Sequence, residues 1–255
     1  MCLILFAIDQ HRDYPLVLAA NRDEFHERPT IPMHWWPEAN VLAGRDERSG
    51  GTWLAVSPGG TISAVTNVRE GSAEPGQLTR GQLPLMVQQQ PRKAVRQHLA
   101  DNGNLYAGFN LVQLYNREGW YYSNRDAHPG RTLHRGTYGL SNHLLQSPWP
   151  KLVRLREQLR GTLNATAPGA PEMMHHALLE QLQDTSPAPD HLLPDTGVGL
   201  ERERFLSSPF IRSELYGTRA STVVTVARSG EIRVTEQTWL RDGAPDEKQH
   251  FCWCG

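Results

Sequence analysis

The first 25 residues constrain the fold of this chain more than any other segment. Residues 2–8 form a short, continuous apolar run that ends at Asp9, which is typical of a strand buried on both faces. A second apolar stretch, residues 16–20, follows a Pro-containing turn and leads directly into a polar tetrad at residues 21–24. The two stretches predict an antiparallel hairpin that returns the tetrad to the start of the chain, beside Cys2.

The rest of the chain alternates between groups of strands and groups of helices. Three further hairpins are predicted around Gly-containing turns: 53–57 with 61–67, 108–115 with 120–123, and 222–228 with 231–239. Helical periodicity predicts helices at roughly 80–90, 92–100, 150–163 and 171–183. Because helices occur in blocks, antiparallel sheets covered by helices are favoured over a doubly wound parallel sheet. Residues 185–199 predict a surface loop, and we expect one domain over residues 1–255.

Composition excludes several classes of partner. The formal net charge is −1, from 26 basic and 27 acidic residues mixed along the chain, so no stretch predicts nucleic-acid binding. The first residues lack a basic leader, and no apolar run reaches the roughly 18 to 20 residues needed to cross a bilayer. Three cysteines give no disulfide framework, which predicts a reducing, cytoplasmic location. The pattern leaves the oligomeric state open.

Metal-binding signals are weak. The eleven histidines are scattered, and neither an HExxH nor a CxxCH motif occurs. The segment Cys252-Trp253-Cys254 is too short to form a zinc site alone and is interpreted as a pair of cysteines at a strand end. We therefore expect no metal site.

Cys2 is the main candidate for chemistry. Removal of Met1 would leave a thiol and a free α-amine on one residue. An α-amine titrates near about 7.7 to 8.0 and a free thiol near about 8.5, so the neutral amine can accept the thiol proton. This predicts an N-terminal cysteine nucleophile. The alternative interpretation is a small hydrophobic side chain in a core strand that retains Met1.

The tetrad offers polar groups next to that cysteine. In an extended strand, Asn21 and Asp23 face one side, while Arg22 and Glu24 face the other. We expect one pair to reach Cys2, with Asp23 holding an α-ammonium or orienting a substrate amine, and the other pair to form a structural ion pair. The alternative is a solvated strand end with a turn and a salt bridge.

Eight separated segments, in the same order, resemble the NRDE family, to which the animal transport and Golgi organisation 2 proteins belong. They are MCLILFA, LAANRDEFHERPT, AGRDERSGGTWLAV, AVTNVRE, GFNLV, YYSNRD, YGLSNHLLQSPWPK and YGTRASTVV. This family is in turn similar to the N-terminal-nucleophile (Ntn) hydrolases, in particular the cysteine branch with choloylglycine hydrolase and penicillin V acylase. The resemblance implies an α+β fold, a four-layer αββα sandwich of two antiparallel sheets.

The resemblance also implies roles for individual residues. It implies Cys2 as nucleophile, Asp23 beside its amine, the amides of Asn67 and Asn142 near an oxyanion or substrate, and Arg219 as a charge that steadies the site. The remaining tetrad members are expected to bind substrate: Asn21, Arg22 and Glu24. Asn67 and Asn142 also end predicted strands, where asparagine is an ordinary turn residue. The cysteine hydrolases carry an arginine three residues before the aspartate, where this chain has Ala20.

Two functions are compatible with these features. The first is a cysteine amidohydrolase that acts on a small-molecule amide and requires no cofactor. The second is a non-catalytic carrier that binds haem, or an acyl-CoA or lipid, in the same pocket, because the NRDE family is associated with haem trafficking.

Overall fold

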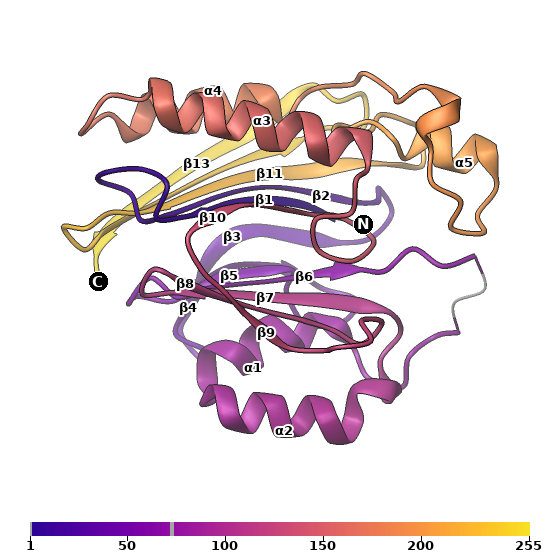
Figure 1. The fold of residues 1–255 in the computed structure, drawn as a ribbon, viewed down its shortest axis with the longest axis horizontal. Coiled ribbons are helices and arrows are strands. Elements are labelled where there is room, and N and C mark those ends of the chain that lie inside the picture. The colour runs from indigo at the N-terminus through magenta and orange to yellow at the C-terminus, as the bar shows by residue number, and fades with distance from the viewer. Residues whose placement is uncertain (1, 72–73) are drawn as a thin grey trace.

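The chain folds into four layers in the order helix, sheet, sheet, helix (Figure 1). The structure is a computed structural model that describes residues 2–71 and 74–255. Neighbouring strands within both sheets pair antiparallel. The predicted α+β fold, an αββα sandwich of two antiparallel sheets, is confirmed.

Thirteen described strands make up the two sheets. The six-stranded sheet has the order β10 (Gly136–Leu140), β1 (Cys2–Ile8), β2 (Leu16–Phe25), β11 (Tyr216–Val226), β12 (Glu231–Trp239) and β13 (Pro245–Cys254). The seven-stranded sheet follows chain order: β3 (Thr30–Trp36), β4 (Val41–Asp46), β5 (Leu54–Val56), β6 (Ile62–Asn67), β7 (Phe109–Tyr115), β8 (Glu118–Ser123) and β9 (Arg131–Leu133).

Helices cover the outer face of each sheet (Figure 1). On the six-stranded sheet lie α3 (Pro150–Ala165) and α4 (Pro171–Gln181), and on the seven-stranded sheet lie α1 (Leu83–Gln89) and α2 (Arg92–Asn102). These four helices were predicted from the sequence. The short elements are α5 (Leu200–Phe205), η1 (Arg80–Gln82), η2 (Gly103–Leu105) and η3 (Asp190–Leu192). No helix in the described part of the chain is long and apolar enough to cross a membrane.

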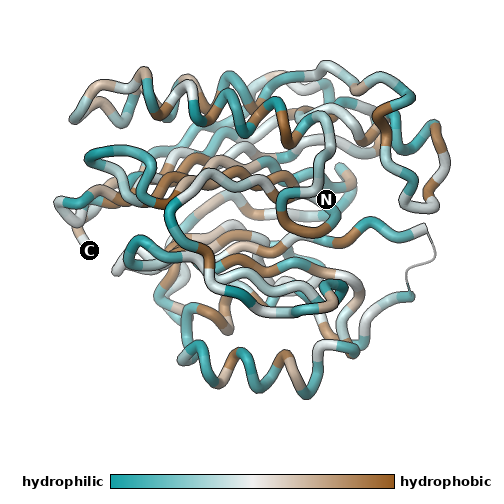
Figure 2. The backbone as a smooth tube through the Cα atoms, viewed as in Figure 1, coloured by the Kyte–Doolittle hydropathy of each residue, from teal (hydrophilic) through white to brown (hydrophobic). Residues whose placement is uncertain are grey.

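Strand β1 contributes to two of the apolar layers. Its side chains at Ile4 and Phe6 pack between the two sheets, whereas Leu3 and Leu5 pack against α3 and α4. The backbone is correspondingly hydrophobic through the centre of the sandwich (Figure 2). Full burial of such a side chain stabilises the fold by about 1.5 to 3 kcal/mol. The prediction of a first strand buried on both faces is confirmed.

The predicted hairpins are also present. Strands β1 and β2 pair antiparallel, as do β5 with β6, β7 with β8, and β11 with β12. Cys252 and Cys254 lie at the end of β13, as expected for cysteines at a strand end. The sequence analysis did not anticipate β3, β4, β9 or most of β13.

The loop between β4 and β5 packs tightly on η1, and this contact generates a stability prediction. Thr52 N donates to Gly81 O at 2.8 Å, and a Cβ at Gly51 would lie 2.4 Å from the carbonyl carbon of Gly81. Because backbone atoms cannot rotate away, we expect Gly51→Ala to lower the free energy of unfolding by about 1 to 3 kcal/mol. Urea unfolding measures this change.

Gly161→Ala is the matched control. Gly161 lies inside α3, and no atom lies within 4 Å of a Cβ built there. Alanine at this position is expected to raise stability by about 1 kcal/mol. Equal stability of Gly51→Ala and the parent chain would show that the loop can move off η1.

Candidate active site around Cys2

Cys2 borders a hollow of about 120 Å³ that both sheets and η1 line. The cysteine is half-buried at the first position of β1, and Met1 lies outside the described residues. Four of the other residues selected from the sequence line the same hollow: Arg22, Asp23, Glu24 and Asn67. The structure therefore brings five of the eight selected residues to one small polar space.

The register of β1 and β2 decides which tetrad side chains face the thiol. Cys2 lies directly opposite Arg22, and opposed residues of an antiparallel pair project to the same face. Arg22 and Glu24 therefore share the face of Cys2, between the two sheets. The predicted alternation is present, but the expectation that the pair containing Asp23 faces the thiol is wrong. The pair that shares the face of Cys2 is also the one that forms ion pairs, Arg22 with Asp46 and Glu24 with Arg28.

The other pair projects toward the helix layer. Asn21 Nδ2 donates to the carbonyls of Leu182 and Pro209, at 2.8 and 3.0 Å, and is buried away from the hollow. Asp23 Oδ1 accepts from Thr218 Oγ1 at 2.7 Å. Because Cys2 is paired with Arg22, Asp23 lies one position further along β2, on the side of the Cys2 backbone nitrogen. Asp23 is therefore placed near the amine end of Cys2 and away from its thiol.

Burial and neighbouring charges act in opposite directions on Asp23. Burial raises the pKa of the Asp23 carboxyl, while the ammonium of Lys151 and the hydrogen bond from Thr218 lower it. Lys151 is itself buried, its Nζ donates to Leu206 O at 2.8 Å, and burial lowers its pKa to about 8. A carboxylate at Asp23 thus depends on the nearby positive charge.

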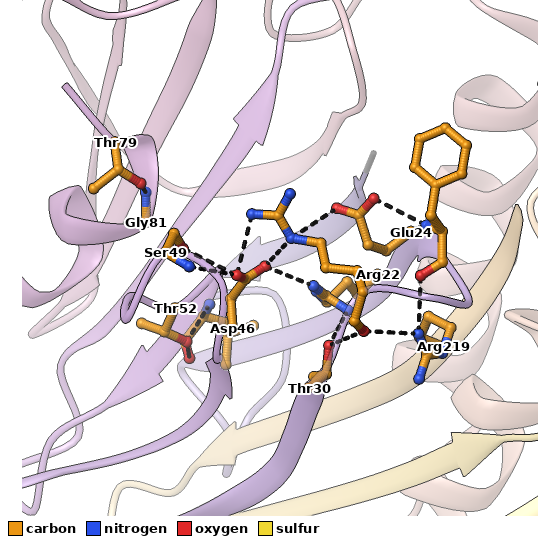
Figure 3. A network of polar contacts seen from close by, with 12 residues as sticks. Arg22, Glu24, Thr30, Asp46, Ser49, Thr52, Thr79, Gly81 and Arg219 are labelled. Atoms are coloured by element: carbon orange, nitrogen blue, oxygen red, sulfur yellow. Dashed lines mark hydrogen bonds and ion pairs between the residues drawn. The ribbon is translucent and has the colours of Figure 1, made fainter. Parts of the chain in front are cut away.

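Asp46 connects two arginines at the wall of the hollow (Figure 3). Its Oδ2 accepts from Arg22 Nη2 at 3.1 Å and from Arg28 Nε at 2.5 Å. Its Oδ1 accepts from Arg28 Nη2 and from the backbone and hydroxyl of Ser49, at 3.0 to 3.1 Å. Burial alone would raise the pKa of Asp46, but the hydrogen bonds from Arg28 and Ser49 hold it below its usual range.

The guanidinium of Arg22 is covered by an aromatic ring, and its terminal nitrogens are hydrogen-bonded. Its carbon lies 4.4 Å from the ring centre of Trp53, and its Nη1 donates to Thr30 Oγ1 at 3.1 Å. With the Asp46 contact, these interactions leave Arg22 only 4% exposed. Arg22 therefore forms part of the wall, and its nitrogen atoms are already engaged.

Asn67 and Asn142 occupy different places. Asn67 ends β6 and lines the hollow, and within the described residues its side-chain amide makes no hydrogen bond. Asn142 is buried, and its Nδ2 donates to Asn67 O at 3.2 Å. The amide of Asn67 is thus available to a ligand, whereas Asn142 positions the backbone that carries it.

Arg219 lies outside the hollow at a bulge between β2 and β11. Its Nη1 donates to the carbonyls of Phe25, His26 and Arg28, at 3.1, 3.4 and 3.3 Å. Figure 3 shows it next to the turn that follows Glu24. Arg219 therefore holds the turn that carries Arg28.

Arg80 is the functional candidate that sequence reasoning did not single out. It begins η1 and lines the hollow with Cys2, and its Nη1 donates to Gly108 O at 2.9 Å. No carboxylate of the described residues forms an ion pair with it. Burial lowers the pKa of Arg80, and the negative charges of the Cys2 thiolate and Glu24 oppose that shift. The short sequence around Arg80 contains no signal for this position, because the contact is made by folding.

The Cys2 thiol is less acidic than a free thiol. Burial raises its pKa, the carboxylates of Asp23 and Glu24 raise it further, and the charge of Arg22 lowers it. Residues 2–71 and 74–255 contain no group of three His, Cys, Asp or Glu side chains placed to hold a metal ion. The raised pKa favours the protonated thiol near pH 7.

The Asp46 network generates a prediction for stability and pH. We expect Asp46→Asn to lower the free energy of unfolding by about 3 kcal/mol, because two largely buried guanidiniums lose their counter-charge. The folded pKa of Asp46 is depressed, so its contribution is present above the unfolded pKa of about 3.9 and is lost as pH falls. Urea unfolding near pH 7 and near pH 3 therefore gives a difference between parent and variant that shrinks in acid.

Glu38→Gln serves as the control for this prediction. It removes the carboxylate of the exposed Arg45–Glu38 pair. Loss of an exposed ion pair of this kind changes the free energy of unfolding very little. A loss for Asp46→Asn no larger than that for Glu38→Gln would contradict the role given to the network.

The sequence is similar to proteins of one family over nearly its whole length. The family model described as Transport and Golgi organisation 2 matches residues 1–241. A Bos taurus Transport and Golgi organization protein 2 homolog is 35% identical, and a Mus musculus homolog is 32% identical, each over 94% of both chains. Drosophila melanogaster Transport and Golgi organization protein 2 is 26% identical over 93% of this chain and 92% of that protein. The chain therefore belongs to the Transport and Golgi organisation 2 family, the NRDE family that its sequence segments resemble.

Proposed function

We propose that this chain is an amidohydrolase that uses Cys2 as its nucleophile when Cys2 is the first residue of the mature protein. The observation that carries the proposal is the position of Cys2. Its side chain borders a polar hollow, and the register of β1 and β2 puts Asp23 on the side of its backbone nitrogen. A thiol, an amine and a carboxylate partner for that amine are then provided at one place.

The amine supplies the base that the raised pKa of the thiol demands. In the first step the α-amine takes the thiol proton and sulfur attacks the amide carbonyl carbon. The C–N bond breaks, the amine product leaves with that proton, and a thioester on Cys2 remains. Water then attacks the thioester, gives one proton through the α-amine to the departing sulfur, and releases the acid. No cofactor is needed for this cycle.

Two side chains are proposed to stabilise the oxyanion. The free amide of Asn67 can donate one hydrogen bond, and the guanidinium of Arg80 adds positive charge in the same hollow. A preorganised donor of this kind contributes about 2.7 to 4 kcal/mol to the stability of a transition state. Asn142 and Arg219 are proposed to act indirectly, because they hydrogen-bond to the backbone carbonyls of Asn67 and Arg28 and so hold these two residues in position.

The hollow favours a small polar substrate. Its volume of about 120 Å³ lies below the roughly 300 to 1,000 Å³ of pockets that enclose drug-sized ligands. Haem, an acyl-CoA or a lipid would require this space to open widely. We therefore place the carrier function second, and expect the substrate to be a compact amide with an anionic group that can meet Arg80.

Mass spectrometry of the purified intact protein tests the first requirement. We expect the mass of a chain that begins at Cys2, because only then does the residue carry an α-amine. A chain that keeps any residue before Cys2 lacks the amine, and this result would rule out the proposed base.

Labelling with an amide-mimicking electrophile tests the nucleophile. We expect Cys2 to react faster than Cys252 and Cys254, although these two are exposed, because the amine and Arg80 assist only at Cys2. Peptide mass spectrometry compares the three sites in one sample. Cys2→Ala is expected to abolish turnover of an amide substrate, and Cys252→Ser is the control with unchanged turnover. A parent chain that binds haem equally well as Cys2→Ala and cleaves no amide would favour the carrier.

Arg80→Gln tests the substrate class. We expect kcat/KM for an anionic amide to fall about tenfold or more, and kcat/KM for a neutral amide of the same size to fall less, because a charge-assisted contact is lost. Arg96→Gln, on the exposed surface of α2, is the matched control. An equal fall in kcat/KM for both substrates would contradict a contact between Arg80 and an anionic group of the substrate, and would leave Arg80 only the role of stabilising the oxyanion.

A further inference from the structure

A second cavity lies on the other side of the six-stranded sheet. It has a volume of about 330 Å³ and is lined by α4 and by strands β12 and β13. No residue that lines it also lines the hollow at Cys2. In Figure 1, α4 lies in the helix layer above this sheet. The cavity is therefore independent of the proposed reaction.

Strand β13 presents a row of polar side chains to this cavity. Lys248, His250 and Cys252 alternate along the strand and line the cavity. Their opposite neighbours on β12 are Gln237, Thr235 and Arg233, respectively. All three side chains are exposed, so the row is open to a ligand.

The residues that line the cavity include two bases, Arg233 and Lys248, and one acid, Glu172. Arg233 is paired with both Glu172 and Glu231, so its own positive charge is fully compensated. Lys248 forms no ion pair with any described residue, and its opposite neighbour is the uncharged Gln237. Lys248, which is exposed, is therefore the base of the lining that no described carboxylate pairs with.

A chain of hydrogen bonds orients His250. Thr225 Oγ1 and Thr235 Oγ1 contact the two ring nitrogens of His175, at 3.0 and 2.8 Å, and Thr235 Oγ1 also contacts His250 Nδ1 at 3.0 Å. His175 is buried, which lowers its pKa to about 4, so its ring is neutral near pH 7. The nearby bases, Arg233 and Lys248 among them, lower this pKa further, and the carboxylate of Glu172 raises it.

This chain leaves one nitrogen of His250 for a ligand. A neutral His175 donates from one nitrogen and accepts at the other, so each threonine hydroxyl has a partner. His250 Nδ1 is engaged by Thr235, and Nε2 is the free nitrogen of the ring. A neutral His250 can then present an Nε2–H donor when Thr235 donates to its Nδ1.

We propose that this cavity is a second ligand site, which binds a small molecule through an oxyanion held by Lys248 Nζ and His250 Nε2. The volume of about 330 Å³ falls at the lower end of the range of about 300 to 1,000 Å³ for small-molecule pockets. Ammonium and imidazole N–H groups are strong donors to phosphate and carboxylate oxygens. Pro171 and Leu179 supply an apolar wall for the rest of the ligand.

Calorimetric titration of the full chain tests the site with two probes, inorganic phosphate and acetate. Ionic strength is held constant with chloride, so that screening of the surface charges does not change. We expect saturable binding of at least one probe, and at least about tenfold weaker binding to Lys248→Gln and to His250→Ala. Binding of phosphate alone indicates a phosphate-bearing ligand, and binding of acetate indicates a carboxylate.

Lysine acylation gives a second readout without any substitution. The chain has three lysines, and Lys93 is exposed on α2 whereas Lys151 is buried. We expect the bound probe to slow acylation of Lys248 and to leave Lys93 unchanged, as followed by peptide mass spectrometry. Lys93→Gln is the matched control and should bind the probe like the parent.

Two results would overturn the proposal. The first is a parent chain that binds neither probe at concentrations up to about 10 mM, which is weaker than specific small-ligand sites require. The second is equal binding by the parent, Lys248→Gln and His250→Ala. Both outcomes are independent of whether Cys2 is catalytic, because neither measurement uses the hollow at Cys2.

Discussion

The antiparallel pairing of β1 with β2 is the constraint on which the Cys2 site depends. Both strands are flanked on each side within the six-stranded sheet and bury both faces, so a slip by one residue would move every apolar side chain to the wrong layer. The same register fixes Arg22 opposite Cys2 and Asp23 one position beyond. The energy that places the polar groups therefore comes from hydrocarbon burial further along the two strands.

Asp46 then makes that arrangement electrostatically possible. Arg22 brings a positive charge between the sheets, where an uncompensated charge would cost several kcal/mol. Asp46 on β4 compensates it and also accepts from Arg28, so a strand of the second sheet is tied to the first. The network uses up the hydrogen-bonding capacity of Arg22 and leaves Arg80 as the guanidinium without an ion-pair partner among the described residues.

Local pattern was enough to predict most of the layers. The apolar runs of β1 and β2, the Gly-containing turns and the helical periodicity are all properties of short segments, and they correspond to elements of the structure. Strand β3 was missed because Pro32 and half-exposed side chains interrupt its alternation, and β13 was missed because it is polar and mostly exposed.

The contacts of the candidate site were harder to predict than the layers. Asp46 with Arg22, and Arg80 with Cys2, are contacts between distant segments, so no spacing within either segment indicates them. The alternation within the tetrad was predicted, but the face that meets Cys2 required the register.

The position of Ala20 bears on how this chain could differ from the cysteine hydrolases that it resembles. Ala20 and Arg22 are two residues apart on β2, so their side chains share the face of Cys2. A guanidinium is thus present on that face, two residues nearer to the site. Its nitrogen atoms, however, already bond to Asp46 and Thr30, and its face is covered by Trp53. Under the proposed function, a substrate would therefore meet its positive charge at Arg80, which lines the same hollow as the cysteine. This geometry favours substrates in which an anionic group and the scissile amide are close together, since about 120 Å³ leaves little room for a spacer.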